Sequence, residues 1–174
     1  GYDLVKLMAG SHGTLGVLTE VAFRVQAMPD AEATVVLPVA EAADAVAMLS
    51  LALASPYDLS GAAYDGRVLL RVEGTAGSVT YRSDALRRLI GGDIVTGAES
   101  AAIWQGIRDV GAFHGNPGAI WRVSVKPTDG PVLLAGAGAD VKCVMDWGGG
   151  LVWLMVPEDG DAGAAQGVRA CGGR

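Results

Sequence analysis

Two tight turns between apolar runs constrain the fold of this chain more than any other feature. The first is Asp65-Gly66, which separates two predicted strands within residues 58–74. The second is the glycine triplet 148–150, which separates "DVKCVMDW" from "LVWLMVP". Turns of this kind connect antiparallel neighbours. The two hairpins therefore predict an antiparallel sheet.

Helical and strand periodicities alternate along the rest of the chain. Apolar residues recur at helical spacing within 41–54, 78–90 and 100–110, and residues 162–170 suit a last helix. Residues 33–39 and 119–127 read as strands, and the run 151–156 is apolar on both faces and suits an interior strand. This order predicts an α+β fold, an antiparallel sheet with helices on one face, related to ferredoxin-like split units. The two halves of residues 31–170 share a similar element order, as an internal duplication would produce.

Composition excludes several classes of protein. Hydrophobic residues make up 51% of the 174 residues, yet no apolar run reaches the ~18–20 residues that span a bilayer. A net charge of −6 gives no basic surface for nucleic acid. Cys143 and Cys171 are too few for a disulfide scaffold and lack metal-site spacing, which favours buried thiols in a reducing cytoplasm.

A glycine-rich loop opens the chain. Gly10, Gly13 and Gly16 recur every three residues, with Ser11 and Thr14 between them, and an alternating run over 17–25 follows as a predicted strand. The spacing fits neither a Walker loop nor a dinucleotide fingerprint. Glycines that adopt positive φ can direct N–H groups toward an anion, but they also make tight turns. The spacing alone leaves both readings open.

The residues around this loop resemble those of a known family. The stretch "YDLVKLMAGSHGTLGVLTEVAFRV" (2–25) is similar to FAD-linked oxidases of the vanillyl-alcohol oxidase, or PCMH, type. With "WRVSV" and "VMDWGGGLVWLMVP", the likeness is greatest to the FAD-binding subunits of bacterial glycolate oxidase. His12 departs from the family, where this position is usually acidic, and it receives no catalytic role.

The resemblance implies a cofactor site and a domain boundary. It places Gly10, Ser11, Gly13, Thr14 and Gly16 near the pyrophosphate and ribityl chain of FAD, with Val17 and Thr19 further along the cofactor. Residues 1–28 would be the end of the PCMH-type FAD-binding domain, and 29–174 a substrate (cap) domain truncated at its C-terminus. A chain without the upstream phosphate loop is expected to bind FAD weakly or not at all and to be inactive by itself.

The resemblance also implies an activity and partners. The parent protein would oxidise a 2-hydroxy acid such as glycolate or D-lactate by hydride transfer to FAD. It would work beside a related flavin subunit and an iron-sulfur subunit, in the cytoplasm, and would reach the inner membrane only through those partners. A stand-alone α+β module that binds a small metabolite without chemistry is the alternative, and the upstream gene sequence discriminates between the two.

Few residues qualify as catalytic, and none is assigned. Arg122 is the candidate for gripping a substrate carboxylate, because guanidinium binds carboxylate through two parallel hydrogen bonds, although strand alternation alone explains its position. Arg67 and Arg71 are weaker candidates, and His114 reads as a loop histidine. Asp140 and Asp146 flank Cys143 without a histidine, so no metal site is expected. The remaining aromatic candidates, read as core and sheet packing, are Trp104, Trp121, Trp147 and Trp153.

Overall fold

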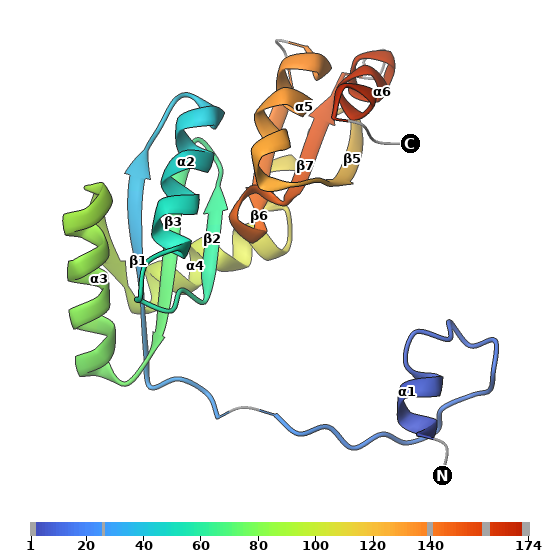
Figure 1. Ribbon diagram of the computed structural model, residues 1–174, viewed down its shortest axis with the longest axis horizontal. Helices are drawn as coiled ribbons and strands as arrows, with labels where there is room; N and C mark the ends of the chain where they lie inside the picture. Colours follow the sequence, from blue (N-terminus) through green and yellow to red (C-terminus); the bar gives the residue numbers. More distant parts are fainter. Residues whose placement is uncertain (1–2, 26, 139–140, 158–160, 172–174) are drawn as a thin grey trace.

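The fold is seen in a computed structural model that describes residues 3–25, 27–138, 141–157 and 161–171. Within these residues, seven strands form one antiparallel sheet in the order β4-β1-β3-β2-β6-β7-β5 (Figure 1). The strands are β1 (Ala31–Pro38), β2 (Gly61–Tyr64), β3 (Arg67–Gly74), β4 (Asp93–Thr96), β5 (Ala119–Ser124), β6 (Lys142–Asp146) and β7 (Leu151–Val156). The helices are α1 (Leu4–Met8), α2 (Ala42–Leu53), α3 (Ala76–Ile90), α4 (Gly97–Arg108), α5 (Gly130–Ala137) and α6 (Asp161–Ala170). Short 3-10 turns lie at η1 (Gly111–Phe113), η2 (Pro127–Asp129) and η3 (Trp147–Gly149). The predicted α+β fold with an antiparallel sheet is confirmed.

Both predicted hairpins form. β2 and β3 join through Asp65-Gly66, where Gly66 takes a φ of 91° that a side chain would disfavour. The Asp65 carboxylate fixes the turn by accepting from the backbone N–H of Arg67 at 3.2 Å and from its Nε at 3.0 Å. β6 and β7 pair from Lys142↔Met155 to Asp146↔Leu151. Local turn chemistry therefore sets the register of both pairs.

The sheet consists of two half-sheets with matching element order. Elements β1-α2-β2-β3-α3-β4 give the ferredoxin-like order β4-β1-β3-β2, and β5-α5-β6-β7-α6 give the order β6-β7-β5. The halves meet where β2 lies antiparallel to β6, through the pair Tyr64↔Met145. β2 and β6 are each the second strand of their half-sheet, so equivalent strands meet at the centre, as in an arrangement around a two-fold axis.

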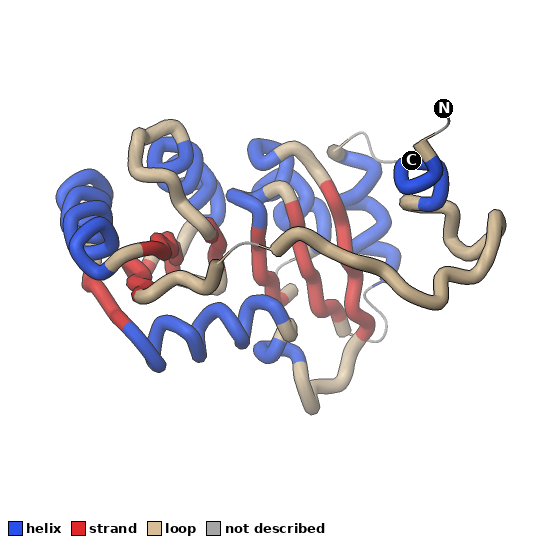
Figure 2. The backbone as a smooth tube through the Cα atoms, turned by 90° about the horizontal axis from the view of Figure 1, so that it is seen from below, coloured by secondary structure: helices blue, strands red, loops and turns tan. Residues whose placement is uncertain are grey.

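One face of the sheet carries the main core. Every second residue of each central strand points to this face, and helices α2, α3, α5 and α6 cover it. The largest fully buried side chains on it include Leu49, Leu70, Leu86, Leu133, Met145 and Leu154. Figure 2 places these helices above the strands. Both half-sheets thus share one continuous hydrophobic layer.

The opposite face is covered only in part, by α4. Trp104 and Ile107 of α4 pack with Leu69, Val144 and Met155, which alternate with the residues of the main core. Figure 2 shows α4 beneath the strands, apart from the other helices. The expectation of helices on one face therefore holds for α2, α3, α5 and α6 but was wrong for α4. Its apolar stripe has the same helical period whichever face it covers, so periodicity alone could not decide the side.

Helices α5 and α6 approach each other closely at glycines. A Cβ on Gly136 would lie 2.7 Å from the Cα of Gly167, and a Cβ on Gly163 would lie 2.5 Å from the carbonyl oxygen of Ala137. A Cβ on Gly167 would collide with the carbonyl oxygen of Leu133. The spacing of these two helices therefore depends on residues without side chains.

The structure differs from the sequence expectations at four segments. α1, β4 and α5 were not predicted: α1 has only five residues, β4 is only four residues long, and α5 begins at Gly130-Pro131. Residues 17–25 form no strand, and their alternating apolar side chains are exposed, with Val17 at 89% and Val25 at 82%. Alternation produces a strand only where a neighbouring strand supplies hydrogen bonds. No strand of the described chain lies beside this segment.

Within the described residues, no helix combines the length and the apolar character needed to cross a lipid bilayer.

Candidate functional site

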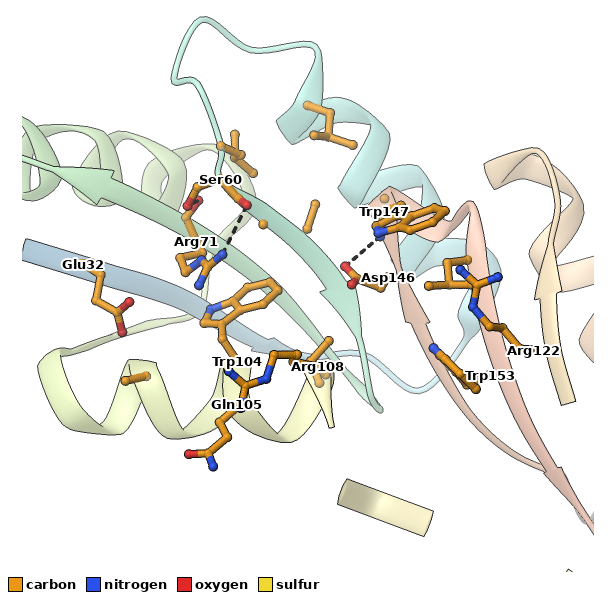
Figure 3. Close-up of a pocket in the computed structure, with 18 residues that line it drawn as sticks. Glu32, Ser60, Arg71, Trp104, Gln105, Arg108, Arg122, Asp146, Trp147 and Trp153 are labelled. Atoms are coloured by element: carbon orange, nitrogen blue, oxygen red, sulfur yellow. Dashed lines mark hydrogen bonds between the residues drawn. The ribbon is translucent and has the colours of Figure 1, made fainter. Parts of the chain in front are cut away.

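A cavity of about 910 Å³ lies on the face of the sheet that α4 covers in part (Figure 3). It crosses from the first half-sheet to the second, and its lining combines cations with aromatic rings. The arginines are Arg71, Arg108 and Arg122, and the indoles are Trp104, Trp147 and Trp153. A cavity of this size with a few polar groups is typical of a small-molecule site.

Arg122 stands at the β5 end of the cavity, between two indoles. It lies opposite Trp153 in the β5–β7 register, and its guanidinium carbon is 5.7 Å from the centroid of that ring. Trp147 contributes a second ring at 5.6 Å. Both distances are within cation–π range. Among the residues that the structure describes, no hydrogen bond or ion pair engages this guanidinium, so its donors are free for an anion.

Trp147 owes its position to the turn between β6 and β7. Its backbone is left-handed, with φ at 54°, and the Asp146 carboxylate accepts its N–H at 2.7 Å. Gly148 and Gly149 follow with φ of 66° and 100°, and a Cβ on Gly148 would collide with the Leu53 side chain. The turn leaves the residue Trp147 60% exposed, beside Arg122. The packing role expected for this tryptophan is therefore wrong, whereas Trp104 and Trp153 do pack on the sheet.

Arg71 marks the other end of the cavity, on β3. Its guanidinium carbon lies 4.7 Å from the ring centroid of Trp104, which is itself fixed by donating from Nε1 to Thr34 Oγ1 at 2.8 Å. Thr34 Oγ1 also bonds to Ser100 Oγ at 2.7 Å, and both residues are fully buried. This chain of contacts connects α4, β1 and β3. It holds the indole, and hence the arginine, in place.

The Arg71 end carries no excess positive charge. Arg71 Nε lies 3.3 Å from a Glu73 carboxylate oxygen, close enough for an ion pair but without hydrogen-bond geometry. Glu32 stands directly opposite Glu73 in the β1–β3 register, and its buried Oε1 has no hydrogen-bond partner. Arg108, the third cation, is paired with Asp109 at 2.7 Å, which raises the pKa of Arg108 and lowers that of Asp109. The cation available to a ligand is therefore at the Arg122 end.

The glycine loop forms a separate hollow of about 390 Å³. Gly10 and Gly13 have φ of 79° and 78°, and a Cβ on either would meet nothing within 4 Å. Their role in the described chain is therefore conformational, and the space beside them is open to another molecule. Of the residues predicted to contact a cofactor, the hollow brings together Gly10, Ser11, Gly13, Gly16 and Val17.

Two predicted residues of the loop are placed differently. The Thr14 hydroxyl donates to the carbonyl oxygen of Ser11 at 2.7 Å and closes the turn, so it is not free for a ligand in this arrangement. Thr19 lies beyond the hollow on the exposed segment. The loop and the sheet cavity have no lining residue in common.

Other candidate groups remain outside both sites. His114 is exposed at the end of η1, and Asp140 lies outside the described residues. Burial raises the pKa of the Cys143 thiol to about 11. No group of three or more His, Cys, Asp or Glu residues suited to a metal ion occurs in the described ranges. The sequence reading missed the indoles beside Arg122, because their proximity requires β5 to pair with β7.

No family model matches the chain. A comparison with curated proteins finds glycolate oxidase subunit GlcE of Escherichia coli (strain K12), which is 38% identical over 159 residues. The resemblance to a bacterial glycolate oxidase subunit is confirmed. The match covers 88% of this chain, which spans 41% of the length of GlcE. The match therefore includes most of the sheet.

Proposed function

We propose that this chain is part of a flavin-linked oxidoreductase subunit of the glycolate oxidase type, which oxidises a 2-hydroxy acid with FAD as the hydride acceptor. The 38% identity with GlcE supports the class of protein. The single observation that carries the chemistry is Arg122, a cation held between two indoles without a polar partner in the described chain. A guanidinium in this state suits the carboxylate of a 2-hydroxy acid.

The glycine loop supports the cofactor part of the proposal. Gly10, Gly13 and Gly16 present bare backbone around an open hollow, as the approach of a diphosphate requires. Ser11 would complete the contacts to the pyrophosphate and ribityl chain, and Thr14 would join it only by giving up its bond to the Ser11 carbonyl oxygen. Val17 and Thr19 would lie further along the cofactor. FAD, when bound, supplies the acceptor for the hydride of the substrate carbon.

The residues of the cavity would bind and orient the acid. Arg122 would hold the carboxylate through two parallel hydrogen bonds, and Trp147 and Trp153 would stabilise the guanidinium through cation–π contacts. No side chain is assigned to accept the hydroxyl proton.

The domain boundary and the partners belong to the same proposal. Residues 1–28 would belong to an FAD-binding domain and 29–174 to a cap domain, since the sheet begins at Ala31 and the preceding segment is exposed. A related flavin subunit and an iron-sulfur subunit would complete a cytoplasmic complex. The exposed apolar side chains of Leu4, Leu7, Phe23 and Met28 are consistent with burial against further protein.

The test uses the intact subunit that contains these residues, purified with FAD. Addition of glycolate or D-lactate is expected to bleach the flavin absorbance. Arg122→Gln should raise KM about 10- to 100-fold, because a charge-assisted pair to the substrate is lost.

Arg88→Gln is the matched control, because it removes the same charge at a distance from the cavity. Arg88 is exposed on α3, which covers the opposite face of the sheet. A flavin that no 2-hydroxy acid bleaches would contradict the proposal. Equal KM values for Arg122→Gln and Arg88→Gln would show that Arg122 does not bind the substrate.

A further inference from the structure

The side chains around Arg122 restrict the chemistry of the rest of a ligand whose anionic group binds there. Trp147 and Trp153 lie at 5.6 and 5.7 Å from its guanidinium carbon, and Leu151 lines the same end of the cavity. The side chains at this end are therefore the two indoles and Leu151, together with the Asp146 carboxylate, which accepts the backbone N–H of Trp147 at 2.7 Å. A ligand whose carboxylate lies on Arg122 would place its other atoms against indole.

The size of the cavity points the same way. About 910 Å³ lies near the upper end of the ~300–1,000 Å³ range of pockets that enclose drug-sized ligands. The cavity therefore has room for an aryl group beside Arg122, whereas a two-carbon acid would not contact the 60% exposed residue Trp147 beyond its carboxylate. Aromatic rings gain affinity by stacking on such a surface.

The far end of the cavity argues against a second acidic group. Arg71 already faces Glu73 at 3.3 Å, and Glu32 adds a second carboxylate there. β3 and β5 are four strand spacings apart, ~19 Å at about 4.8 Å per strand. A dianion would therefore reach the Arg71 end only if it were long, and it would meet balanced or negative charge there.

We propose that the cavity binds an aryl-substituted monocarboxylic acid, with its carboxylate on Arg122 and its ring against the indole of Trp147. The binding claim stands on the cavity alone, and it rests on the proposed function only in taking this ligand as the substrate, an aryl-substituted 2-hydroxy acid. Trp147 is then the residue that sets the preference for an aromatic over an aliphatic side chain.

Calorimetric titration of the chain tests the proposal without flavin. The probes are 3-phenyllactate and mandelate, compared with glycolate and D-lactate. The aryl acids are expected to bind on the order of three- to tenfold more tightly, the gain typical of an added aromatic pair. Arg122→Gln should weaken binding of all four acids by about 10- to 100-fold.

Variants at position 147 separate stacking from a general effect on the fold. Trp147→Ala should weaken binding of the aryl acids by on the order of three- to tenfold and leave glycolate unchanged, whereas Trp147→Phe should retain most of the preference. Circular dichroism confirms that each variant is folded. If Trp147→Ala is unfolded, Trp147→Phe and the comparison of the four acids on the unaltered chain still test the preference for aryl acids.

Equal or tighter binding of glycolate, or no binding of any acid, would overturn the inference. The intact flavin-loaded subunit distinguishes this failure from that of the proposed function. Tighter binding of aryl acids without bleaching would support the inference and contradict the proposed oxidation. Bleaching by glycolate, without tighter binding of the aryl acids, would support the proposed oxidation and contradict the inference about aryl acids.

Discussion

Arg122 differs from the other two arginines of the cavity in its polar contacts. Arg71 has Glu73 and Arg108 has Asp109, whereas the described residues around Arg122 offer it only aromatic faces. Indoles stabilise a cation without using its N–H donors. An anion that binds Arg122 therefore displaces no protein carboxylate, and this is the physical basis of both proposals.

The buried hydroxyl of Thr34 gives a prediction about stability. It serves both Ser100 and the Trp104 Nε1–H, so Thr34→Val leaves a buried indole donor without its partner. The expected loss in the free energy of unfolding is about 1–3 kcal/mol, measured by urea denaturation. Ser100→Ala is the control: it keeps the bond to Trp104 and should cost less. A Ser100→Ala loss equal to or larger than that of Thr34→Val would contradict this account.

Cys143 gives a prediction about reactivity. Burial raises the pKa of its thiol to about 11, from a reference value of 9.0. The thiolate is the reactive form, so at pH 8 the folded chain should be alkylated about 100-fold more slowly than the unfolded chain. Iodoacetamide labelling of a Cys171→Ser variant, with and without urea, measures this ratio. Similar rates in the two states would show that the thiol is not shielded.

Individual residues show where sequence reasoning succeeds and where it ends. Asp65-Gly66 was sufficient to place a hairpin, because the turn residues act on their immediate neighbours. The sequence indicates Arg122 as a candidate, but it predicts only packing roles for Trp147 and Trp153 and does not indicate that they lie beside Arg122. Their meeting depends on the pairing of β5 with β7 across about 30 residues of chain. No local pattern contains that information.

At the scale of elements, the contact between α5 and α6 gives a third prediction. A Cβ on Gly167 would collide with the carbonyl oxygen of Leu133 and lie 3.2 Å from the backbone nitrogen of Ala137. Gly167→Ala should therefore destabilise the chain by about 1–3 kcal/mol through overpacking, as measured by thermal or urea unfolding.

Gly106→Ala is the matched control for this substitution. Gly106 also lies inside a helix, α4, but a Cβ there would meet nothing within 4 Å. Its replacement should stabilise the chain by up to about 1 kcal/mol, because alanine has the higher helix propensity. If both substitutions stabilise the chain, the close contact of α5 with α6 is not the reason for Gly167.

Helices and strands with a clear period were predictable, and the others were not. α2, α3, α4 and α6 follow their apolar stripes, whereas α5 starts with Gly130-Pro131 and β4 is a four-residue strand. The alternating run 17–25 has the sequence of a strand but lacks a neighbour in the described chain. Periodicity reports which residues share a face, and pairing is decided by the rest of the fold.

At the scale of the molecule, the N-terminal segment stands apart from the sheet. Figure 1 shows it extending away from the strands, and its side chains from Val17 to Val25 are exposed. Removal of residues 1–28 should therefore change the free energy of unfolding by no more than about 0.5 kcal/mol, as for surface changes. Urea denaturation of the shortened and full chains measures the difference. A loss of several kcal/mol would show that this segment packs on the sheet in solution.

The seam between the half-sheets has a mechanical consequence. β2 and β6 are joined at the pair Tyr64↔Met145, and the cavity extends across that line, with Arg71 on one side and Arg122 on the other. A small swivel about the seam would widen or narrow the opening while the pairing of β1 with β3 and of β5 with β7 stayed intact. The width of the opening is thus set at the β2–β6 pairing, whereas the position of Arg122 beside Trp153 is set by the β5–β7 pairing.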